Sequence, residues 1–304
     1  MKNKLSVSIV IAYYNGADYI AETLQSIHRQ TVKPNEVVLV NDGSSNFNET
    51  QARKAYADCC LTVVTHESNL GLAQARNTAI KASNSDLILP LDQDDLLAET
   101  FIEKTIPLLN DPLTDGVYSF VQLFGDRSDL WCPEITLPNL LTGAPPPSSI
   151  IFRRELFDKV GGFRSECNSP DSDFWLRALG INCQLKLLPE PLLKYRKHGA
   201  SLSEKTKLTE ISDLFNNNER IYHNNLATVI SHLESRLNTT KEEYRQLEEG
   251  FKELESGYSE LLTRYDTAVS DLASLSIRKW LLGAFKRNRP VRSKPSSENL
   301  KPEI

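Results

Sequence analysis

The chain has 304 residues, of which 40% are hydrophobic and 25% charged, with a formal net charge of −5. These values are ordinary for a soluble protein, and the length allows one large domain or two modest ones. The negative charge argues against nucleic acid as a partner of the whole chain. The last thirty or so residues are nevertheless basic, so the average conceals a local shift in charge.

Cysteine usage and the apolar segments predict the compartment. The five cysteines show neither a C-x-x-C spacing nor an even pairing, and we interpret them as reduced thiols without zinc: Cys59, Cys60, Cys132, Cys167 and Cys183. Lys2 and Lys4 precede only a short apolar run without a small-residue cleavage site, so we expect no signal peptide. No stretch approaches the ~20 apolar residues of a spanning helix. We therefore expect the protein to stay inside the cell, in the cytoplasm.

Buried strands and helical segments alternate along the first third of the chain. The predicted strands are 5–12, 36–40, 61–65 and 86–91, and helical spacing begins near Ile20, Asn48 and Ala73. This alternation predicts an α/β fold with a parallel sheet. Ligands of such sheets bind beyond the carboxyl ends of the strands.

Three polar side chains directly follow predicted strands and should converge on one crevice. Tyr14 offers a flat face on which a base can stack. Asp42 can accept a hydrogen bond from the imide N–H of uracil or thymine. Asp92 follows the fourth strand. Nearby, Arg76 suits either an acidic neighbour or phosphate, through its planar fork, or a surface salt bridge on a helix.

Three carboxylates close the fourth strand in the sequence LPLDQDD. Clustered acids at a strand end are costly unless a positive charge lies there. Mg²⁺ commonly lies between one or two carboxylates and substrate phosphates. The alternative is a solvated turn followed by a helix, because aspartate is favoured in both places.

The later part of the first 204 residues contains further strands and a second acidic segment. We predict strands at 115–124, 149–153, 185–188 and 192–195, with a loop-rich stretch around 125–148. The sequence Gly161-Gly162-Phe163 predicts a turn that places an aromatic ring under the pocket. The sequence SPDSDFWLRAL at 169–179 predicts a helix that begins at Ser169 or Asp171.

The segments SIVIAYYN, EVVLVNDGSS, NLGLAQARN, LPLDQDD, RRELFDKVGGF, SDFWLRAL and YRKHGASLS, in this order, resemble a family 2 glycosyltransferase of the GT-A fold. The resemblance covers residues 5–204 and implies an inverting enzyme that uses a nucleotide-diphospho-sugar with Mn²⁺ or Mg²⁺. It places Ala12, Tyr14 and Asp42 at the base with Arg76 nearby, Asp92 at the ribose and metal, and Asp94 as the metal ligand. Asp95 is then expected to cap a helix.

The resemblance also implies a catalytic base. The family's Glu-Asp pair aligns with Pro170 and Asp171, so we expect Asp171 to deprotonate the acceptor hydroxyl. The missing glutamate either alters acceptor recognition or lets Asp173 share the work. His198 is expected at the metal or diphosphate, while Arg196 is expected either to reach the diphosphate or to pack beside Tyr195.

The composition changes beyond residue 204. A helical connector at 205–229 is followed by about seven heptads of apolar residues at 230–276, which predict a coiled-coil oligomerisation stalk. The alternative is one helix that packs along its own catalytic domain.

The basic end of the chain predicts contact with lipid. Residues 277–292 combine an apolar helical side with lysines and arginines, which is typical of a helix on an anionic membrane. The alternative is a helix that only ends the coiled coil. Residues 293–304 are expected to be disordered.

Together these features predict an inverting, metal-dependent glycosyltransferase of the hexosyl or N-acetylhexosaminyl class. It would move a sugar from a UDP-sugar to a hydroxyl of a growing, lipid-linked cell-surface glycan, at the cytoplasmic face of the inner membrane. One rival is a catalytically silent GT-A domain that serves as a coiled-coil scaffold. Another, a nucleotidyltransferase, is disfavoured because no glycine-rich triphosphate loop follows the first strand.

Overall fold

The computed structural model describes residues 5–56, 61–198 and 208–274. The strands are β1 (Val7–Tyr13), β2 (Glu36–Asp42), β3 (Leu61–His66), β4 (Leu87–Pro90), β5 (Leu96–Leu97), β6 (Gly116–Gly125), β7 (Leu130–Trp131), β8 (Ile151–Arg153) and β9 (Leu185–Lys197). The helices are α1 (Ile20–His28), α2 (Glu49–Ala55), α3 (Leu72–Ala82), α4 (Phe101–Leu109), α5 (Leu137–Leu141), α6 (Arg154–Val160), α7 (Pro170–Gly180), α8 (Leu208–Asn217), α9 (Glu219–Asn224) and α10 (Leu226–Ser274).

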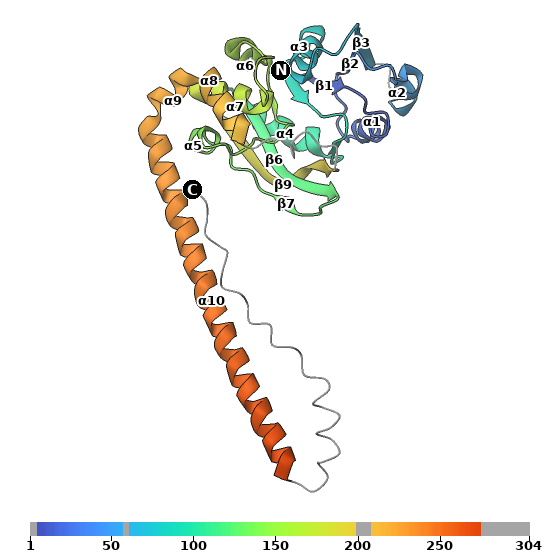
Figure 1. The fold of residues 1–304 in the computed structure, drawn as a ribbon. Helices are drawn as coiled ribbons and strands as arrows, with labels where there is room; N and C mark the ends of the chain where they lie inside the picture. Colours follow the sequence, from blue (N-terminus) through green and yellow to red (C-terminus); the bar gives the residue numbers. More distant parts are fainter. Residues whose placement is uncertain (1–4, 57–60, 199–207, 275–304) are drawn as a thin grey trace. The chain divides into compact units, whose positions relative to one another are not determined.

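The described strands form one mixed sheet in the order β3-β2-β1-β4-β8-β6-β9-β5, and β7 pairs with β6 (Figure 1). Strands β1 to β4 are parallel to one another, as the alternation of strands and helices predicted. Strand β8 runs antiparallel to β4 and to β6, and it joins this parallel half to the rest of the sheet. The carboxyl ends of β1, β2 and β4 therefore lie at one edge, where Asp42 ends β2 and where Tyr14 and Asp92 follow β1 and β4.

Two apolar layers cover the sheet, because successive side chains of a strand point to opposite faces. Ile9 and Ile11 of β1 pack with α1, α2 and α4 on one face. Val10 packs on the other face with α3, α5, α6 and α7. β1 and β2 are almost wholly apolar because helices bury them from both sides.

The prediction of two short strands at 185–188 and 192–195 is wrong, since β9 is one strand of 13 residues. Pro189 and Pro191 lie between the two predicted strands, and proline donates no ladder hydrogen bond. The structure instead absorbs them where the β6–β9 register shifts on either side of Phe120. Such an irregularity tolerates unpaired backbone groups.

The described part of segment 205–229 belongs to the first compact unit, Met1–Glu234, whereas we expected a separate connector. Leu214 of α8 and Tyr222 of α9 are buried. Asn218, between these two helices, donates a hydrogen bond to Asp173 at 2.8 Å. A second unit begins at Ser235, and α10 continues into it as one helix.

Two predictions for the end of the chain cannot be compared with this fold. The amphipathic membrane helix at 277–292 and the tail at 293–304 both lie outside the described residues. Within the part that is described, no helix has the length and apolarity to cross a bilayer.

Candidate active site

Arg76 is the centre of the site. It lies on α3, is 1% exposed, and donates to two carboxylates, Oδ1 of Asp92 and Oδ1 of Asp171, each at 2.7 Å. Burial opposes its charge, but Asp171 and Asp92 outweigh burial and raise the pKa of the Arg76 guanidinium. Of the roles considered for Arg76, pairing with acidic neighbours is confirmed and the surface salt bridge is wrong. One cation thus joins the end of β4 to the start of α7.

The ring of Phe163 packs against the guanidinium of Arg76. The guanidinium carbon of Arg76 lies 5.4 Å from the ring centroid of Phe163, which stacks on Phe174 at 4.6 Å. The turn before Phe163 uses positive φ at Gly161 and Gly162, where a Cβ would be strained. The expected turn and its buried aromatic ring are therefore confirmed, while the position of this ring under an acceptor pocket stays a prediction.

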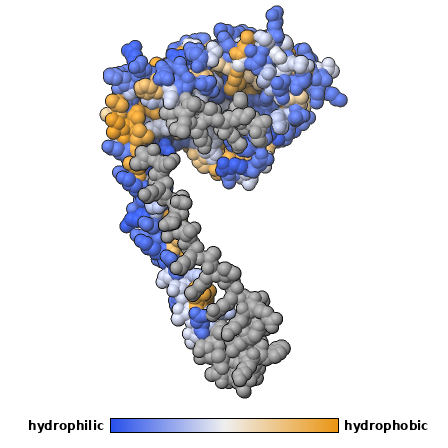
Figure 2. Space-filling model, in the orientation of Figure 1, coloured by the Kyte–Doolittle hydropathy of each residue, from blue (hydrophilic) through white to orange (hydrophobic). Residues whose placement is uncertain are grey.

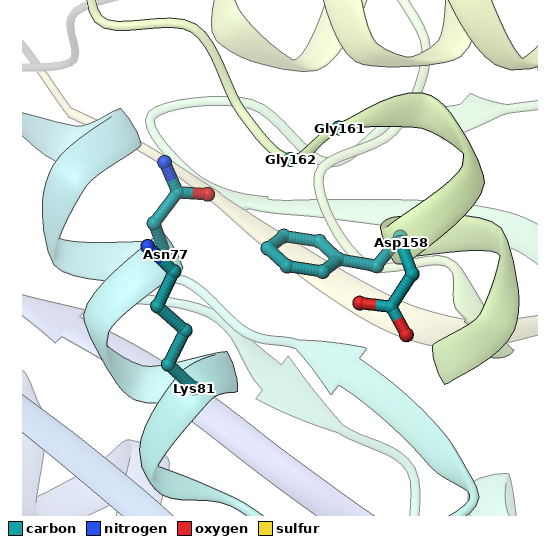
Figure 3. A pocket seen from close by; sticks show the side chains of 6 residues that line it. Asn77, Lys81, Asp158, Gly161 and Gly162 are labelled. Carbon is teal, nitrogen blue, oxygen red and sulfur yellow. The ribbon is translucent and has the colours of Figure 1, made fainter.

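The outer side of α3 fixes the same turn. Asn77 donates to the carbonyl of Phe163 at 2.7 Å and accepts from its N–H at 2.9 Å. Figure 3 shows Asn77 and Lys81 of α3 beside the Gly161–Gly162 turn and Asp158 of α6, around a hollow of about 220 Å³. None of the carboxylates at the strand ends lines this hollow. It adjoins the support of the site and is not the site itself.

Asp171 stands at the start of α7, where Pro170 occupies the first helical turn. Proline suits this position because the first N–H groups of a helix have no intrahelical partner. The side chain of Asp171 is bound to Arg76. Although Pro170 stands where the family has a glutamate, the site therefore keeps a carboxylate that faces Asp92. Burial, opposed by Arg76 and reinforced by Asp92, raises the pKa of the Asp171 carboxyl.

Asp173 does not face the site, so the alternative that it shares the work of the base is wrong. Its Oδ2 accepts two hydrogen bonds from Arg177, and its Oδ1 accepts from Asn218. It is 0% exposed. Two residues after Asp171 on a helix, its side chain points in a different direction, towards α8 and α9. It ties α7 to these helices.

Asp94 and His198 meet although they are far apart in the sequence. Nε2 of His198 lies 2.9 Å from Oδ2 of Asp94. The imidazole stacks on Tyr19 with ring centroids 5.0 Å apart, which orients the ring. Burial and the charge of Asp92 raise the pKa of the Asp94 carboxyl, against the lowering effect of His198. The predicted pair of metal ligands is brought together.

Asp95 is not a helix cap, contrary to expectation, because it leads into strand β5 and Thr100 precedes α4. It is fully buried. Its Oδ1 accepts from the backbone N–H of Arg196 at 2.9 Å, and its Oδ2 accepts from Ser148 at 3.4 Å. Burial, Asp92 and Asp94 raise the pKa of its carboxyl well above the usual value.

Arg196 has several protein partners. Its Nε donates to the carbonyl of Asp94 at 2.9 Å and it forms an ion pair with Glu22. Its guanidinium carbon lies 4.3 Å from the ring centroid of Phe124 and 5.1 Å from that of Tyr19. The packing role is thus with Tyr19 and Phe124, where we had considered Tyr195. Contact with the diphosphate stays a prediction.

Asp42 is a buried acceptor at the end of β2. Its two oxygens accept from the backbone N–H groups of Leu70 and Gly71, each at 2.9 Å, just before α3. Nδ1 of His66 lies 2.7 Å from Oδ1. The carboxylate thus holds the loop before α3 in place. The sequence analysis missed His66, although its place at the end of β3 was a usable signal.

Tyr14 and Gln93 connect the first strand to the acidic cluster. Gln93 donates to the carbonyl of Tyr14 and accepts from its N–H, at 3.0 and 2.9 Å. A Cβ on Gly16 would lie 2.2 Å from Oε1 of Gln93, so a larger residue there would displace the Gln93 amide from Tyr14. Tyr14 is 47% exposed, as a stacking surface for a base requires. Ala12 lies beside Val40 at the same sheet edge.

The acidic cluster has the chemistry of a divalent-cation site. Asp94 and His198 supply oxygen and nitrogen ligands. The raised pKa values of Asp94 and Asp95 reflect burial first and then the negative charge of neighbouring aspartates, which a cation would offset. Over the described ranges, no group of three or more His, Cys, Asp or Glu side chains converges as a metal site. The residues therefore fit an ion that takes its remaining ligands from substrate phosphates and water.

A comparison with known protein families shows the family to which the chain belongs. The family model described as "Glycosyl transferase family 2" matches residues 8–165. The chain belongs to glycosyltransferase family 2. The matched region spans β1 to α6 and contains both Arg76 and the acidic cluster of Asp92, Asp94 and Asp95.

Relatives in sequence carry the same description. The chain is 31% identical to the uncharacterized glycosyltransferase YwdF of Bacillus subtilis, over 57% of this chain and 68% of that protein. It is 30% identical to EpsJ of the same organism, over 65% and 63% of the two chains. It is 31% identical to RP339 of Rickettsia prowazekii, over 69% and 70%. The matches thus leave about a third of each relative uncovered.

Solved structures confirm the GT-A fold expected from the sequence. Staphylococcus aureus TarS 1-349 in complex with UDP-GlcNAc superimposes with a TM-score of 0.57 at 22% identity, over 66% of this chain and 61% of that one. The mannosyltransferase PcManGT of Pyrobaculum calidifontis, in complex with GDP-Man and Mn²⁺, gives 0.58 at 20% identity, over 78% and 76%. At these identities the likeness establishes the fold alone.

Proposed function

We propose that this family 2 glycosyltransferase is an inverting, metal-dependent enzyme that transfers a hexosyl or N-acetylhexosaminyl group from a UDP-sugar to a hydroxyl group. The observation that carries the proposal is the bridge from Asp92 through Arg76 to Asp171. It holds a carboxylate with a raised pKa opposite the acidic strand end. A catalytic base needs this arrangement if the donor lies at the acidic strand end and the acceptor lies beside Asp171.

In this mechanism Asp171 accepts the proton of the acceptor hydroxyl as its oxygen attacks the anomeric carbon. The bond from that carbon to the diphosphate oxygen breaks on the opposite side, so the anomeric configuration inverts. A base with a raised pKa is the better proton acceptor, provided that it is ionised at the working pH. A bound divalent cation would offset the charge of the departing diphosphate.

The donor side rests on the residues at the ends of β1, β2 and β4. We assign the nucleotide base to Tyr14, Ala12 and Asp42, with Arg76 nearby, and the ribose to Asp92. We assign the metal to Asp94, His198 and Asp92, with Arg196 near the diphosphate. The exposed ring of Tyr14 and the buried acceptor Asp42 support a pyrimidine base. Among the structural neighbours, TarS was solved with UDP-GlcNAc and PcManGT with GDP-Man. The test must therefore compare donor sugars that carry different nucleotide bases.

Nucleotide release from a panel of UDP-, dTDP- and GDP-sugars tests this assignment. We expect slow hydrolysis of one UDP-sugar with Mn²⁺ or Mg²⁺, and none with chelator. The variant Asp94→Asn should lower the metal-dependent rate by at least about 100-fold, because a neutral amide is a much weaker ligand for a hard cation. Asp158→Asn on the exposed face of α6 is the matched control and should retain the parental rate.

The outcomes separate the rival functions. A rate that persists with chelator, or that Asp94→Asn leaves intact, would contradict the metal assignment. Metal-dependent UDP binding without release from any donor, even with lipid-linked glycan acceptors added, would favour the silent GT-A scaffold. Hydrolysis of a GDP-sugar in preference would contradict the uridine assignment and leave the transferase intact.

We also propose that the C-terminal part gathers the catalytic domains at an anionic membrane, where the acceptor is a lipid-linked glycan of the cell surface. Because α8 and α9 pack on the catalytic unit, a truncation that tests this must end at Glu234 and keep both helices. We expect the truncated chain to be monomeric and to lose sedimentation with phosphatidylglycerol vesicles, while donor hydrolysis continues. Vesicle binding that equals that of the full chain would contradict the membrane proposal.

A further inference from the structure

Helix α10 exposes a long row of large apolar side chains. They recur three or four residues apart, except between Leu237 and Tyr244, where Thr240 takes the intervening position. They are 48% to 74% exposed: Leu226, Ile230, Leu233, Leu237, Tyr244, Leu247, Phe251, Leu254, Tyr258, Leu261 and Tyr265. We call these residues the α10 seam. Figure 2 shows apolar patches interrupting the hydrophilic surface of this helix. Such a row on an exposed helix is typical of an interaction surface.

The size of the α10 seam matches a protein partner of comparable length. Each aromatic side chain can bury about 150–250 Å². The four aromatic residues alone would therefore bury roughly 600–1,000 Å², about the ~800 Å² per partner of a standard interface. The aliphatic residues add to this. A repeat of three and four residues is the pattern with which one helix packs along another helix.

Two glycines indicate which helix that is. Gly250 and Gly257 lie inside α10, one heptad apart, and each directly precedes an aromatic seam residue, Phe251 or Tyr258. Glycine is among the poorest helix formers. A Cβ at either position would meet no atom within 4 Å, so the single chain does not require glycine there. A close neighbour from another molecule would explain both.

In a parallel pair of helices, a residue at the first core position of a heptad enters a hole formed by four residues of the partner. One of the four is the residue that precedes the equivalent core residue. For Phe251 that residue is Gly250, and for Tyr258 it is Gly257. Each bulky ring of one copy therefore fills the space that a glycine of the other copy leaves open. Two identical helices that run parallel and in register make this match of large with small at both positions, whereas a shift by one heptad would keep only one of the matches.

We propose that α10 binds a second copy of this chain as a parallel, in-register coiled coil, in which Gly250 and Gly257 of each chain receive Phe251 and Tyr258 of the other. The catalytic domains then lie at the same end of the pair. This inference concerns association and does not rest on the transfer reaction.

The charges that flank the seam oppose this pairing weakly. In register, Arg236 would face Lys241 and Glu243 would face Glu248 of the other chain, and all four side chains are exposed. Exposed charge pairs contribute little compared with a buried apolar seam, and salt screens them. We therefore expect self-association of the full chain to tighten as salt is raised.

The two glycines are either incidental or seats for the aromatic rings of the other copy. Replacing them should change the dimer dissociation constant in opposite directions in these two cases. The double variant Gly250→Leu, Gly257→Leu replaces them with a better helix former. If the glycines were incidental, association would stay equal or tighten. With the rings seated on them, we expect the dimer dissociation constant to rise at least tenfold in sedimentation equilibrium. The matched control is Ser256→Leu, Thr263→Leu, on the outer face and also one heptad apart, and it should leave the constant unchanged.

Orientation is tested by disulfide formation at two seam positions. The single variants Leu247→Cys and Leu261→Cys should each form a covalent dimer on mild oxidation, beyond any dimer of the parent chain. Cross-linking at only one of the two positions, or only between the two variants when mixed, would overturn the parallel register. A monomeric parent, or a glycine variant that associates as tightly as the parent, would overturn the proposal. Donor hydrolysis should stay parental in every glycine and control variant, so failure here is distinct from failure of the proposed function.

Discussion

The variant Asp171→Asn is expected to release nucleotide from the preferred donor about 10²–10⁴-fold more slowly than the parent chain, because asparagine cannot accept the acceptor proton. Its amide oxygen can still accept a hydrogen bond from Arg76, so the fold should be preserved. We expect the affinity for UDP to change by no more than a few-fold. The measurements are single-turnover nucleotide release and equilibrium UDP binding.

The pH profile gives the same prediction a second readout. Asp171 works as a base only when ionised, and burial raises its pKa. The parental rate should therefore rise with pH through a limb that lies above the ordinary aspartate value of about 3.9. This limb should be absent from the residual rate of Asp171→Asn. A variant that keeps both the rate and the limb would show that another group removes the proton.

The variant Arg76→Ala is expected to lose about 3–5 kcal/mol of unfolding free energy, since removing one partner of a buried ion pair leaves uncompensated charge. Here two carboxylates, Asp92 and Asp171, would lose the same partner. The matched control is Arg53→Ala, which removes an exposed arginine paired with Glu49. That change should cost less than about 1 kcal/mol. Urea unfolding of both variants gives the comparison.

Lowering the pH should narrow the difference in unfolding free energy between Arg76→Ala and the parent. Burial already raises the pKa of the Asp171 carboxyl against the lowering effect of Arg76, so removal of the guanidinium should raise this pKa further. The folded variant then binds more protons than the folded parent, so its stability relative to the parent increases as pH falls from about 7 to about 5. Equal losses for Arg76→Ala and Arg53→Ala, at any pH, would contradict the central role of the bridge.

Local patterns in the sequence were enough for the parallel half of the sheet and for the edge that carries the site. Apolar runs such as 36–40 must be buried on both faces, and polar residues directly after them must lie at the strand ends. Tyr14, Asp42 and Asp92 were placed in this way. The ordered motifs also indicated the family, now shown by the match over residues 8–165.

The tertiary structure decided which acid faces which partner. Asp171 and Asp173 are close in the sequence, yet one binds Arg76 and the other binds Arg177 and Asn218. Helical rotation over two residues sends their side chains in different directions, and only the packing of α7 shows which side is the site. Asp95 likewise became a buried acceptor through its contact with β9.

The sequence by itself determined the buried strands, the polar residues that follow them and the apolar heptads of α10, because each depends on the spacing of neighbouring residues. It did not determine the continuity of β9 across its prolines or the packing of α8 and α9 on the catalytic unit. Nor did it determine the bridge through Arg76, whose partners lie 16 and 95 positions away. These features depend on contacts between distant segments, which form only when the whole sheet and its helices are assembled.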